Sequence, residues 1–285
     1  MEFLCKFAKI DSYTVDRRDG MLAIAIIIVL YIYLIAPRVW RKPDCSKFLK
    51  QNYAHRGFHN KEVGRPENSM SAFRTAVELN YGIELDVQLT KDNQVVVFHD
   101  YDLKRVCGED KKVCELTYQE IKKYRLCDTN EHIPLLSEVL REVNGKVPLL
   151  VELKCKNMKD KIAAETDHIL KDYSGFYVIQ SFHPVVLFWY RRNHPDVIRG
   201  QLAESRVWKN VLWTIVSFLH QHLVFNVFAR PDFISYNFKH QKELSLNICK
   251  YLFGCPLIAW TVRSKEQFKK CKKRFNSIIF ELFYL

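Results

Sequence analysis

After about residue 50, the chain alternates short apolar, β-branched runs with amphipathic stretches of helical period. This alternation is typical of parallel strands that helices cover on both faces. Eight runs predict strands, over Tyr53–His55, Ile83–Val87, Leu149–Leu153, Tyr177–Ser181, Ile198–Leu202, Asp232–Tyr236, Pro256–Val262 and Ile278–Glu281. Helices are predicted over Ser69–Asn80, Ser137–Val143, Asp160–Asp172, Pro184–Asn193, Gln241–Tyr251 and Lys265–Arg274. Eight strands with helices between them predict a closed (β/α)8 TIM barrel over residues 50–285.

An open, doubly wound sheet is the alternative α/β architecture. Such sheets usually carry a glycine-rich phosphate loop after a strand, and no G-x-G-x-x-G or G-x-x-x-x-G-K pattern follows any predicted strand. The segment from 101 to 134 is too long for one turn and contains a helical piece, so we expect a small cap-like insertion after the second strand.

An uncharged run of 18 residues extends from Gly20 to Pro37. As a helix it would rise about 27 Å, close to the roughly 30 Å of a bilayer's hydrocarbon core. A secretory signal peptide is the alternative, but its apolar region is usually shorter and ends in an A-x-A cleavage pattern that is missing here. We therefore expect an N-terminal tail over 1–19 and a single transmembrane anchor over 20–37.

The net charge of +12 would suit nucleic acid, an anionic membrane surface or a phosphorylated substrate. No nucleic-acid-binding module is present, so we expect a lipid bilayer as a partner and no nucleic acid. The nine cysteines form no C-x-x-C pair, which favours free thiols in a reducing compartment. Together with a slight excess of basic residues after the apolar run, this favours a single-pass membrane protein with a cytoplasmic catalytic domain.

Acidic residues interrupt two of the predicted strands. Glu84 and Asp86 are two residues apart, as are Glu152 and Lys154, so each pair lies on one face of its strand. A salt-bridge ladder is the ordinary explanation of such pairs. Because the neighbouring residues are apolar and both faces should be covered, a bound cation is the better compensation, and oxygen ligands favour Mg²⁺, Ca²⁺ or Mn²⁺.

Two histidines end apolar strands at the expected barrel mouth. His55 follows the first strand directly. The run Gln94–Asp100 follows the second strand too closely for a crossover helix, so it must return antiparallel. A two-residue turn at Asp92–Asn93 would pair His99 with Asp86 on the same face. Two histidines with pKa values near 6.5 could divide the roles of acid and base.

These residues carry a resemblance to a known family. The stretch from Ala54 to Asp100 contains HRG, PEN, E-x-D and HD in that order, and VELK, QSF and AWTV follow later. The pattern resembles the glycerophosphodiester phosphodiesterase signature over nearly all of the chain after the apolar run. The family implies metal-dependent hydrolysis of a glycerophosphodiester, in which the glycerol 2-hydroxyl attacks phosphorus and an alcohol and glycerol 3-phosphate are released.

The resemblance also implies a role for each matching residue. The acid and base would be His55 and His99, the metal ligands Glu84, Asp86 and Glu152, the phosphate-binding residues Arg56 and Lys154, and the aromatic wall of the pocket Trp260. In the PEN turn, Glu67 and Asn68 would shape the loop beneath the metal, and Asn68 could instead cap the following helix. Glu281 stands where many members have aspartate.

Two other functions remain open at this point. One is a lysophospholipase D that uses the same residues on membrane lysolipids, which the anchor and the apolar stretch 207–228 favour. That stretch is otherwise an ordinary buried helix with a loop. The other is a catalytically inactive, membrane-tethered binding module, which would not require both histidines and all three acids. The basic run 269–274 is either a solvated helix face or a second contact with anionic lipid.

Overall fold

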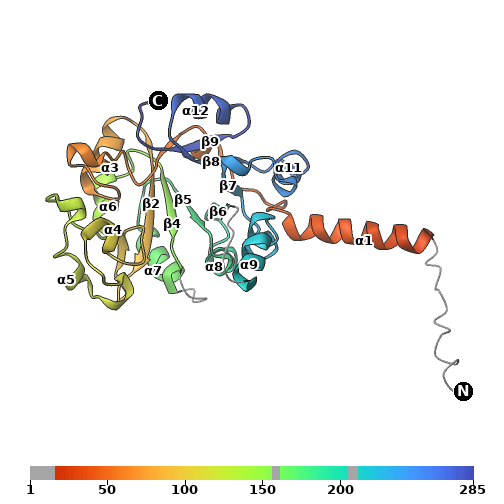
Figure 1. Cartoon of the computed structure of the whole chain (residues 1–285), viewed down its shortest axis with the longest axis horizontal. Coiled ribbons are helices and arrows are strands. Elements are labelled where there is room, and N and C mark those ends of the chain that lie inside the picture. The colour runs from red at the N-terminus through yellow and green to blue at the C-terminus, as the bar shows by residue number, and fades with distance from the viewer. Residues whose placement is uncertain (1–16, 156–160, 205–210) are drawn as a thin grey trace, which may run out of the picture.

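The computed structural model describes residues 17–155, 161–204 and 211–285. Within these ranges, eight parallel strands close into a barrel, because β1 (Tyr53–Ala54) pairs with both β2 (Gly82–Leu89) and β9 (Ser277–Phe280) (Figure 1). The other parallel strands are β4 (Leu149–Leu153), β5 (Tyr177–Ser181), β6 (Arg199–Ala203), β7 (Phe233–Asn237) and β8 (Leu257–Val262). The predicted TIM barrel is confirmed, and each predicted strand agrees within two residues.

Helices surround the barrel and extend beyond it. The longer ones are α1 (Arg17–Ile35), α3 (Met70–Glu78), α6 (Leu136–Val143), α7 (Lys161–Leu170), α8 (Pro184–Asn193), α9 (Val211–Gln221), α11 (Leu244–Tyr251) and α12 (Lys265–Lys272). The short ones are α2 (Ser46–Leu49), α4 (Lys104–Cys107), α5 (Tyr118–Ile121) and α10 (Asn226–Ala229), with 3-10 turns over Lys61–Val63, Val113–Glu115, Leu126–Asp128 and Phe238–His240. The outward strand faces pack against these helices in one apolar core.

The inward strand faces form a second, smaller apolar cluster at the amino ends of the strands. Its buried members are Phe48, Tyr53, Leu150, Val178, Ile198, Phe233, Ile258 and Ile279. The ring of Phe48 on α2 lies 4.6 Å from that of Phe233, so α2 closes this end of the barrel. The carboxyl ends of the strands are left for polar side chains.

The strand that returns after β2 is β3 (Val95–Val97), and it is antiparallel as predicted. Its register differs from the prediction by one residue: Val87 pairs with Val97, and Phe98 donates its backbone N–H to Asp86 O. The loop has three residues between Thr90 and Gln94, with Asn93 at a positive φ of 62°, rather than the two expected. His99 therefore lies just beyond the ladder and not opposite Asp86.

The segment 101–134, for which a small cap-like insertion is expected, lies beside the barrel mouth (Figure 1). It contains α4, α5 and two 3-10 turns, and with β3 it encloses an apolar cluster of its own. The buried members of that cluster are Val96, Phe98, Leu103, Val106, Val113, Ile121, Leu126 and Ile133. Because β3 contributes to this cluster, the cap is fixed to the strand that leads to His99.

The N-terminal helix α1 projects away from the barrel on the side opposite the cap (Figure 1). Among the described residues, none of the helices has the length and apolarity needed to cross a bilayer. The predicted crossing over 20–37 is thus not supported: the helix ends at Ile35, and Ile35 and Ala36 are buried against the barrel. Asn226 Nδ2 donates to Ile35 O at 2.8 Å, and Arg230 Nη1 donates to Ala36 O at 2.8 Å.

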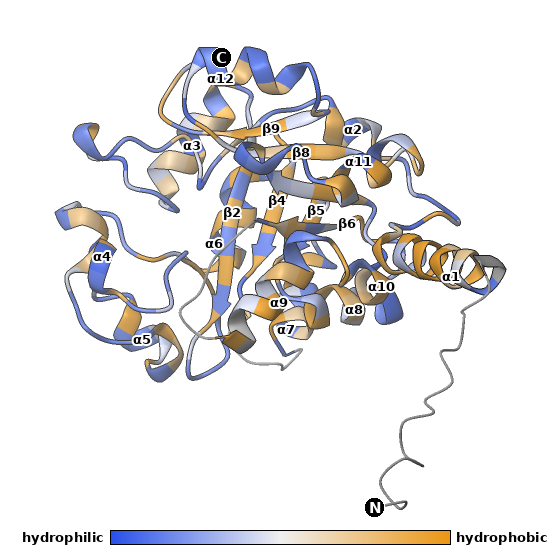
Figure 2. Cartoon of the chain, turned by 45° about the vertical axis from the view of Figure 1, so that its right-hand side comes forward, coloured by the Kyte–Doolittle hydropathy of each residue, from blue (hydrophilic) through white to orange (hydrophobic). Residues whose placement is uncertain are grey.

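Most of α1 before its last turn is exposed and apolar (Figure 2). Its exposed side chains are Met21, Leu22, Ile24, Ile26, Ile27, Ile28, Val29, Leu30 and Tyr33. The stretch 207–228, apart from residues 207–210, which lie outside the described residues, contains α9 and α10. Val211, Ile215, Phe218 and Phe228 there are more than half exposed, so of the two alternatives for this stretch the ordinary buried helix is wrong for this face.

Candidate active site

Three carboxylates meet at the carboxyl ends of β2 and β4. Glu84, Asp86 and Glu152 are all buried, and each offers an oxygen within 4.8 Å of the others. The register brings them together, since Asp86 lies opposite Glu152 and Glu84 lies two pairs lower, on the same face of β2. Burial, with Asp86 and Glu152 beside it, raises the pKa of Glu84 well above its ordinary value.

Lys154 reaches over this acidic group. Its Nζ lies 3.0 Å from Asp86 Oδ1 and 2.5 Å from Glu152 Oε1. Asn68 approaches from the other side and donates from Nδ2 to Asp86 Oδ2 at 3.0 Å. Burial opposes ionisation of Asp86, but Lys154 and its other cationic neighbours hold the pKa of this carboxyl well below its usual range.

The turn after β1 places Arg56 beside the same carboxylates. Its backbone N–H donates to Glu84 Oε2 at 3.0 Å, and its Nε lies 3.4 Å from Asp86 Oδ2. The turn requires glycine at position 57, where φ is +79° and an added Cβ would lie 2.9 Å from the backbone of Ala72. The HRG motif thus supplies both a cation and the close approach of α3 to the barrel.

His55 lies at the end of β1, and its backbone N–H donates to Phe280 O at 2.8 Å. Its Nδ1 hydrogen-bonds with Glu281 Oε2, and the other oxygen of Glu281 accepts from Arg263 Nε. Burial lowers the pKa of His55 to about 4, although Glu281 acts in the opposite direction. His55 is therefore a neutral imidazole near pH 7.

His99 is more exposed and belongs to the cap side of the mouth. Its Nδ1 hydrogen-bonds with Asp100 Oδ1 at 2.6 Å, and Asp100 Oδ2 accepts from Arg105 Nε at 2.6 Å. Arg105 also makes a two-point contact with Glu67, at 2.6 and 2.8 Å. Glu67 in turn accepts from Arg56 Nη1 at 2.7 Å, so ion pairs connect the two sides of the mouth.

Trp260 on β8 forms the aromatic part of the mouth. Its ring meets that of Phe182 edge to face at 5.6 Å, and its buried Nε1 has no hydrogen-bond partner among the described residues. Gln180 on β5 is also buried on the inward face, beside Glu152 in the register. These groups line the side of the mouth opposite the cap strand.

The donor set fits a hard divalent cation. All three converging ligands are carboxylates, which Mg²⁺, Ca²⁺ and Mn²⁺ prefer. Asp86 Oδ1 and Glu152 Oε1 are buried and pair with Lys154 Nζ, but within the described residues neither accepts a hydrogen bond of regular geometry. A cation here would satisfy both oxygens.

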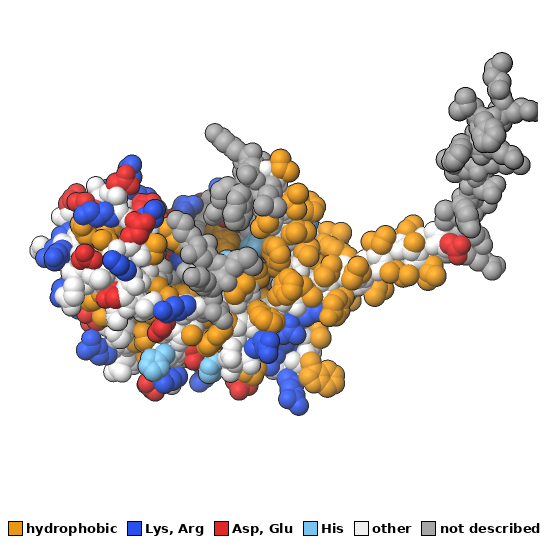
Figure 3. Space-filling view, turned by 90° about the horizontal axis from the view of Figure 1, so that it is seen from below, with side chains coloured by type: hydrophobic (Ala, Val, Ile, Leu, Met, Phe, Trp, Pro, Cys, Tyr) orange, Lys and Arg blue, Asp and Glu red, His pale blue; other side chains and the backbone are white. Residues whose placement is uncertain are grey.

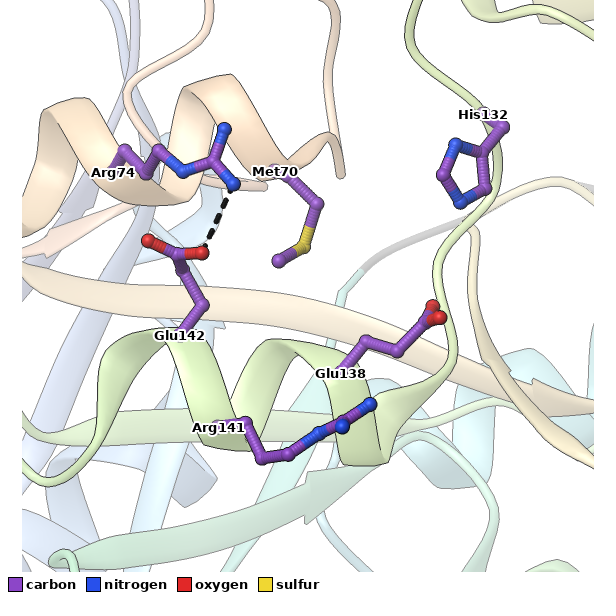
Figure 4. A pocket seen from close by; sticks show the side chains of 6 residues that line it. All are labelled: Met70, Arg74, His132, Glu138, Arg141 and Glu142. Carbon is purple, nitrogen blue, oxygen red and sulfur yellow. Dashed lines mark hydrogen bonds and ion pairs between the residues drawn. The ribbon is translucent and has the colours of Figure 1, made fainter.

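A separate open pocket of about 400 Å³ lies between α3 and α6 (Figure 4). It is lined by Met70, Arg74, His132, Glu138, Arg141 and Glu142, none of which is a predicted site residue. Arg74 and Glu142 pair across it at 3.0 Å. Arg141 donates to Ser137 O and Glu138 accepts from Tyr118 Oη, and the pocket lies on the outside of the barrel.

The structure thus brings the predicted histidines, acids and cations to one end of the barrel, and it adds residues that sequence reasoning missed. Ser69 caps α3, not Asn68, because Ser69 Oγ accepts from Ala72 N at 3.2 Å. Arg105 and Arg263 carried no recognised motif. Glu281 was noted in the sequence as a family position that is often aspartate but was given no role, and its contact with His55 depends on barrel closure.

Comparisons with known proteins agree with this geometry. The model of the family described as "Glycerophosphoryl diester phosphodiesterase family" matches residues 55–280. YhdW of Bacillus subtilis, provisionally named a glycerophosphodiester phosphodiesterase, is 35% identical over 75% of this chain and 86% of its own. The rat protein named lysophospholipase D GDPD1 is 31% identical over 52% of this chain, which spans about half of that protein.

A solved structure shows the same fold. It is an Oleispira antarctica phosphodiesterase in complex with sn-glycerol-3-phosphate, described as its product. The two chains are 21% identical, with a TM-score of 0.67 over 83% of this chain and 94% of the other.

Proposed function

Because the chain belongs to the glycerophosphoryl diester phosphodiesterase family, we propose that it hydrolyses glycerophosphodiesters to an alcohol and glycerol 3-phosphate. It is a phosphoric diester hydrolase whose family is metal-dependent. One observation carries the proposal for this chain: three buried carboxylates, two cations and two histidines converge at the carboxyl ends of the barrel strands, where active sites of this fold lie.

Glu84, Asp86 and Glu152 would hold the divalent cation, Mg²⁺, Ca²⁺ or Mn²⁺. When bound, it would supply positive charge for the phosphoryl oxygens and for the attacking hydroxyl. Arg56 and Lys154 already lie against these carboxylates, so they would bind the phosphate from the same side. The ring of Trp260 would form the wall of the pocket that contacts the carbon skeleton of the substrate.

His55 and His99 would transfer the protons. His55 is neutral near pH 7 because burial lowers its pKa, which suits the group that takes a proton from the glycerol hydroxyl. His99 is more exposed, and its hydrogen bond with Asp100 orients the ring, which suits the group that protonates the leaving alcohol.

The test is hydrolysis of glycerophosphocholine by purified full-length protein, with Mg²⁺, Ca²⁺ or Mn²⁺ and with EDTA, following glycerol 3-phosphate. We expect cation-dependent release that is lost in His55→Ala and His99→Ala. A folded protein without activity under any cation would contradict the proposal. Asp167→Asn is a suitable control, because Asp167 binds His194 at 3.1 Å on the outer wall, between α7 and α8.

A second candidate substrate is a membrane lysolipid, and the observation that favours it is α1. A helix with apolar side chains exposed on every side is unstable in water and suits a lipid surface. Figure 3 shows apolar side chains continuing from α1 onto the adjoining face of the barrel. The apolar side chains of α9 and α10 are exposed too, and His220 at the end of α9 bonds to Phe182 at the mouth.

We propose that this apolar surface binds the lipid bilayer, and that lysolipid could enter the mouth from it as in a lysophospholipase D. Flotation with phosphatidylcholine vesicles tests the contact: the native chain should float, and Ile24→Glu/Ile27→Glu should remain below. Choline release from lysophosphatidylcholine but not from glycerophosphocholine would favour the lysolipid substrate. Equal flotation of both proteins would contradict the bilayer contact.

We further propose that the catalytic barrel faces the cytoplasm. The support is chemical: the eight cysteines of the described residues are free, as in a reducing compartment. Protease digestion of intact and permeabilised cells tests this, since an outward-facing barrel would be cleaved in intact cells.

A further inference from the structure

The two candidate catalytic histidines have matching surroundings, although they come from opposite sides of the barrel mouth. In each case Nδ1 is bound to a carboxylate, Glu281 for His55 and Asp100 for His99. Each carboxylate is also bound by the Nε of an arginine, Arg263 for Glu281 and Arg105 for Asp100. The sequence gives no hint of this pairing, since Glu281 was noted only as a family position and the two arginines belong to no recognised motif.

This arrangement fixes the histidine ring in two ways. A carboxylate on Nδ1 stabilises the tautomer with its proton there, which leaves Nε2 as the nitrogen able to exchange a proton with substrate. The arginine restricts the orientation of the carboxylate, and because the carboxylate is bound to the ring, the plane of the imidazole is fixed as well.

We propose that Glu281 and Asp100, held by Arg263 and Arg105, are positioning residues that set the tautomer and orientation of His55 and His99. The inference rests on the proposed acid and base roles of these histidines. It gives a role to Arg263 and Arg105, which in the described structure do not contact the three proposed cation ligands.

The environment of Glu281 suits this role. The side chain is 9% exposed and keeps its charge, because His55, His59 and Arg263 lower its pKa although burial raises it. His59 Nε2 lies 3.6 Å from the oxygen that also meets His55. Glu281 follows β9 and Arg263 follows β8, so closure of the barrel is what places the pair beside β1.

On the His99 side of the mouth, the cap contributes to the proposed arrangement through Arg105. It is the first helical turn of the insertion that supplies Arg105, and its guanidinium contacts both Asp100 and Glu67. Glu67 also binds Arg56, so one chain of charge-assisted bonds joins the proposed phosphate ligand to His99. Without the cap, Asp100 would keep its place in the sequence but lose its second partner.

A different reading of Glu281 is that it binds a second cation with His55 and His59, since these three could also hold an ion. Arg263 opposes that reading, because its charge already occupies the other oxygen of Glu281. The two interpretations predict different effects of substituting Glu281. If Glu281 is a cation ligand, the substitution lowers the affinity for cation; if it is a positioning residue, the substitution alters the tautomer and orientation of the His55 ring.

The experiment compares Glu281→Gln, Glu281→Asp, Arg263→Gln and Arg105→Gln with the native chain on glycerophosphocholine at saturating cation. We expect kcat to fall about 10- to 100-fold in Glu281→Gln with KM nearly unchanged, and by less in the two arginine variants. Glu281→Asp should restore part of the loss, because it returns the carboxylate. Asp167→Asn, which removes an equally buried carboxylate from a remote histidine, should retain native kcat.

Two further measurements separate positioning from a structural or metal-binding role. In ¹⁵N spectra of histidine-labelled protein, Glu281→Gln should alter the tautomer signature of the resonance that is missing in His55→Ala. Titration with Mn²⁺ should give one site of native affinity in Glu281→Gln, with a native melting temperature.

A native kcat in Glu281→Gln, or an unchanged His55 signature, would overturn the proposal. A loss of one bound Mn²⁺ would replace it with the second-cation reading. The proposed function fails separately: if His55→Ala is itself fully active, His55 has no catalytic role to support. Inactive His55→Ala with fully active Glu281→Gln would remove only the positioning role.

Discussion

The inward faces of three barrel strands change character within two residues. At their amino ends these faces are apolar, and at their carboxyl ends they are charged or polar. On β4 the change is from Leu150 to Glu152, on β5 from Val178 to Gln180, and on β9 from Ile279 to Glu281. Because alternate residues share a face, each pair points into the same barrel at different heights.

The difference shows how one fold separates stability from chemistry. The apolar layer is closed by α2, and the phenol of Tyr53 within it donates a hydrogen bond to Phe48 O, so its energy comes mainly from burial. In the polar layer, buried acids are held by two cations and by neighbouring amides, at a cost that a bound cation would offset. The apolar layer supports the polar layer. Mutations in the polar layer should therefore lower activity more than stability, and mutations in the apolar layer should lower stability more than activity.

The largest expected effect is in the polar layer. Glu84→Gln should lower kcat/KM by about 1,000-fold, since it removes one of three cation ligands and the cation is worth several kcal/mol to the transition state. Without cation, the free energy of unfolding should stay equal or rise, because burial and two acids raise the pKa of Glu84. Urea unfolding in EDTA measures this, and a stability loss as large as that of an apolar truncation would erase the contrast.

The apolar layer should show the reverse. Phe233→Ala should cost about 3 kcal/mol of unfolding free energy, because Phe233 is fully buried against Phe48 and leaves a cavity. Its kcat and KM at a temperature well below unfolding should match the native values, and Phe233→Leu should lose less stability. A large fall in kcat with native Mn²⁺ affinity would show that the apolar layer also tunes the chemistry.

A smaller effect is expected at Gly200, whose inward position is filled by the ring of Phe233. An added Cβ would lie 2.1 Å from that ring, so Gly200→Ala should cost about 2 kcal/mol through overpacking. The two positions are in contact, so the double variant Gly200→Ala/Phe233→Leu should be more stable than the sum of the single losses predicts. Strict additivity in urea unfolding would mean that the ring does not fill this space.

How far the sequence predicts these layers depends on the range of the interaction. Period-two alternation placed Glu152 and Lys154 on one face, and the apolar runs located all eight barrel strands, because both signals are local. The hairpin register was wrong by one residue because loop length was inferred from Asp92–Asn93, whereas the structure has three loop residues. A local pattern cannot choose between two such turns without the packing of the cap.

The residues that hold the histidines depend on contacts between distant segments. Glu281 meets His55 only because the last strand closes against the first, and Arg105 meets Asp100 and Glu67 only after the cap has folded. The N-terminal helix shows the same limit. Composition predicted its apolar character, but its end at Ile35 is set by hydrogen bonds that Asn226 and Cys249 donate to the carbonyl oxygen of Ile35.

The smallest predicted effect tests whether the polar layer, and not the apolar layer, makes the free energy of unfolding depend on pH. Arg105 and Arg56 lower the pKa of Glu67 to about 2 although burial opposes them, whereas the ordinary value is 4.5. A lowered folded pKa stabilises the native state above the unfolded pKa, and this contribution disappears as the pH falls from about 4.5 toward 2. Glu67→Gln should therefore cost about 1 to 2 kcal/mol at pH 7 and progressively less below pH 4.5.

Urea unfolding of Glu67→Gln and the native chain from pH 7 down to pH 3.5 measures that difference, with Phe233→Ala as the matched apolar control. The loss in Phe233→Ala should stay constant over this range. The phenol of Tyr53 and the thiol of Cys45 pack in or against the cluster of Phe48, Tyr53 and Phe233, and both are neutral there because burial raises their pKa values. A Glu67→Gln loss that also stays constant would mean that the bonds from Glu67 to the two arginines do not depend on its charge. The ion pairs that join Arg56 to His99 would then contribute to the shape of the mouth and not to its electrostatics.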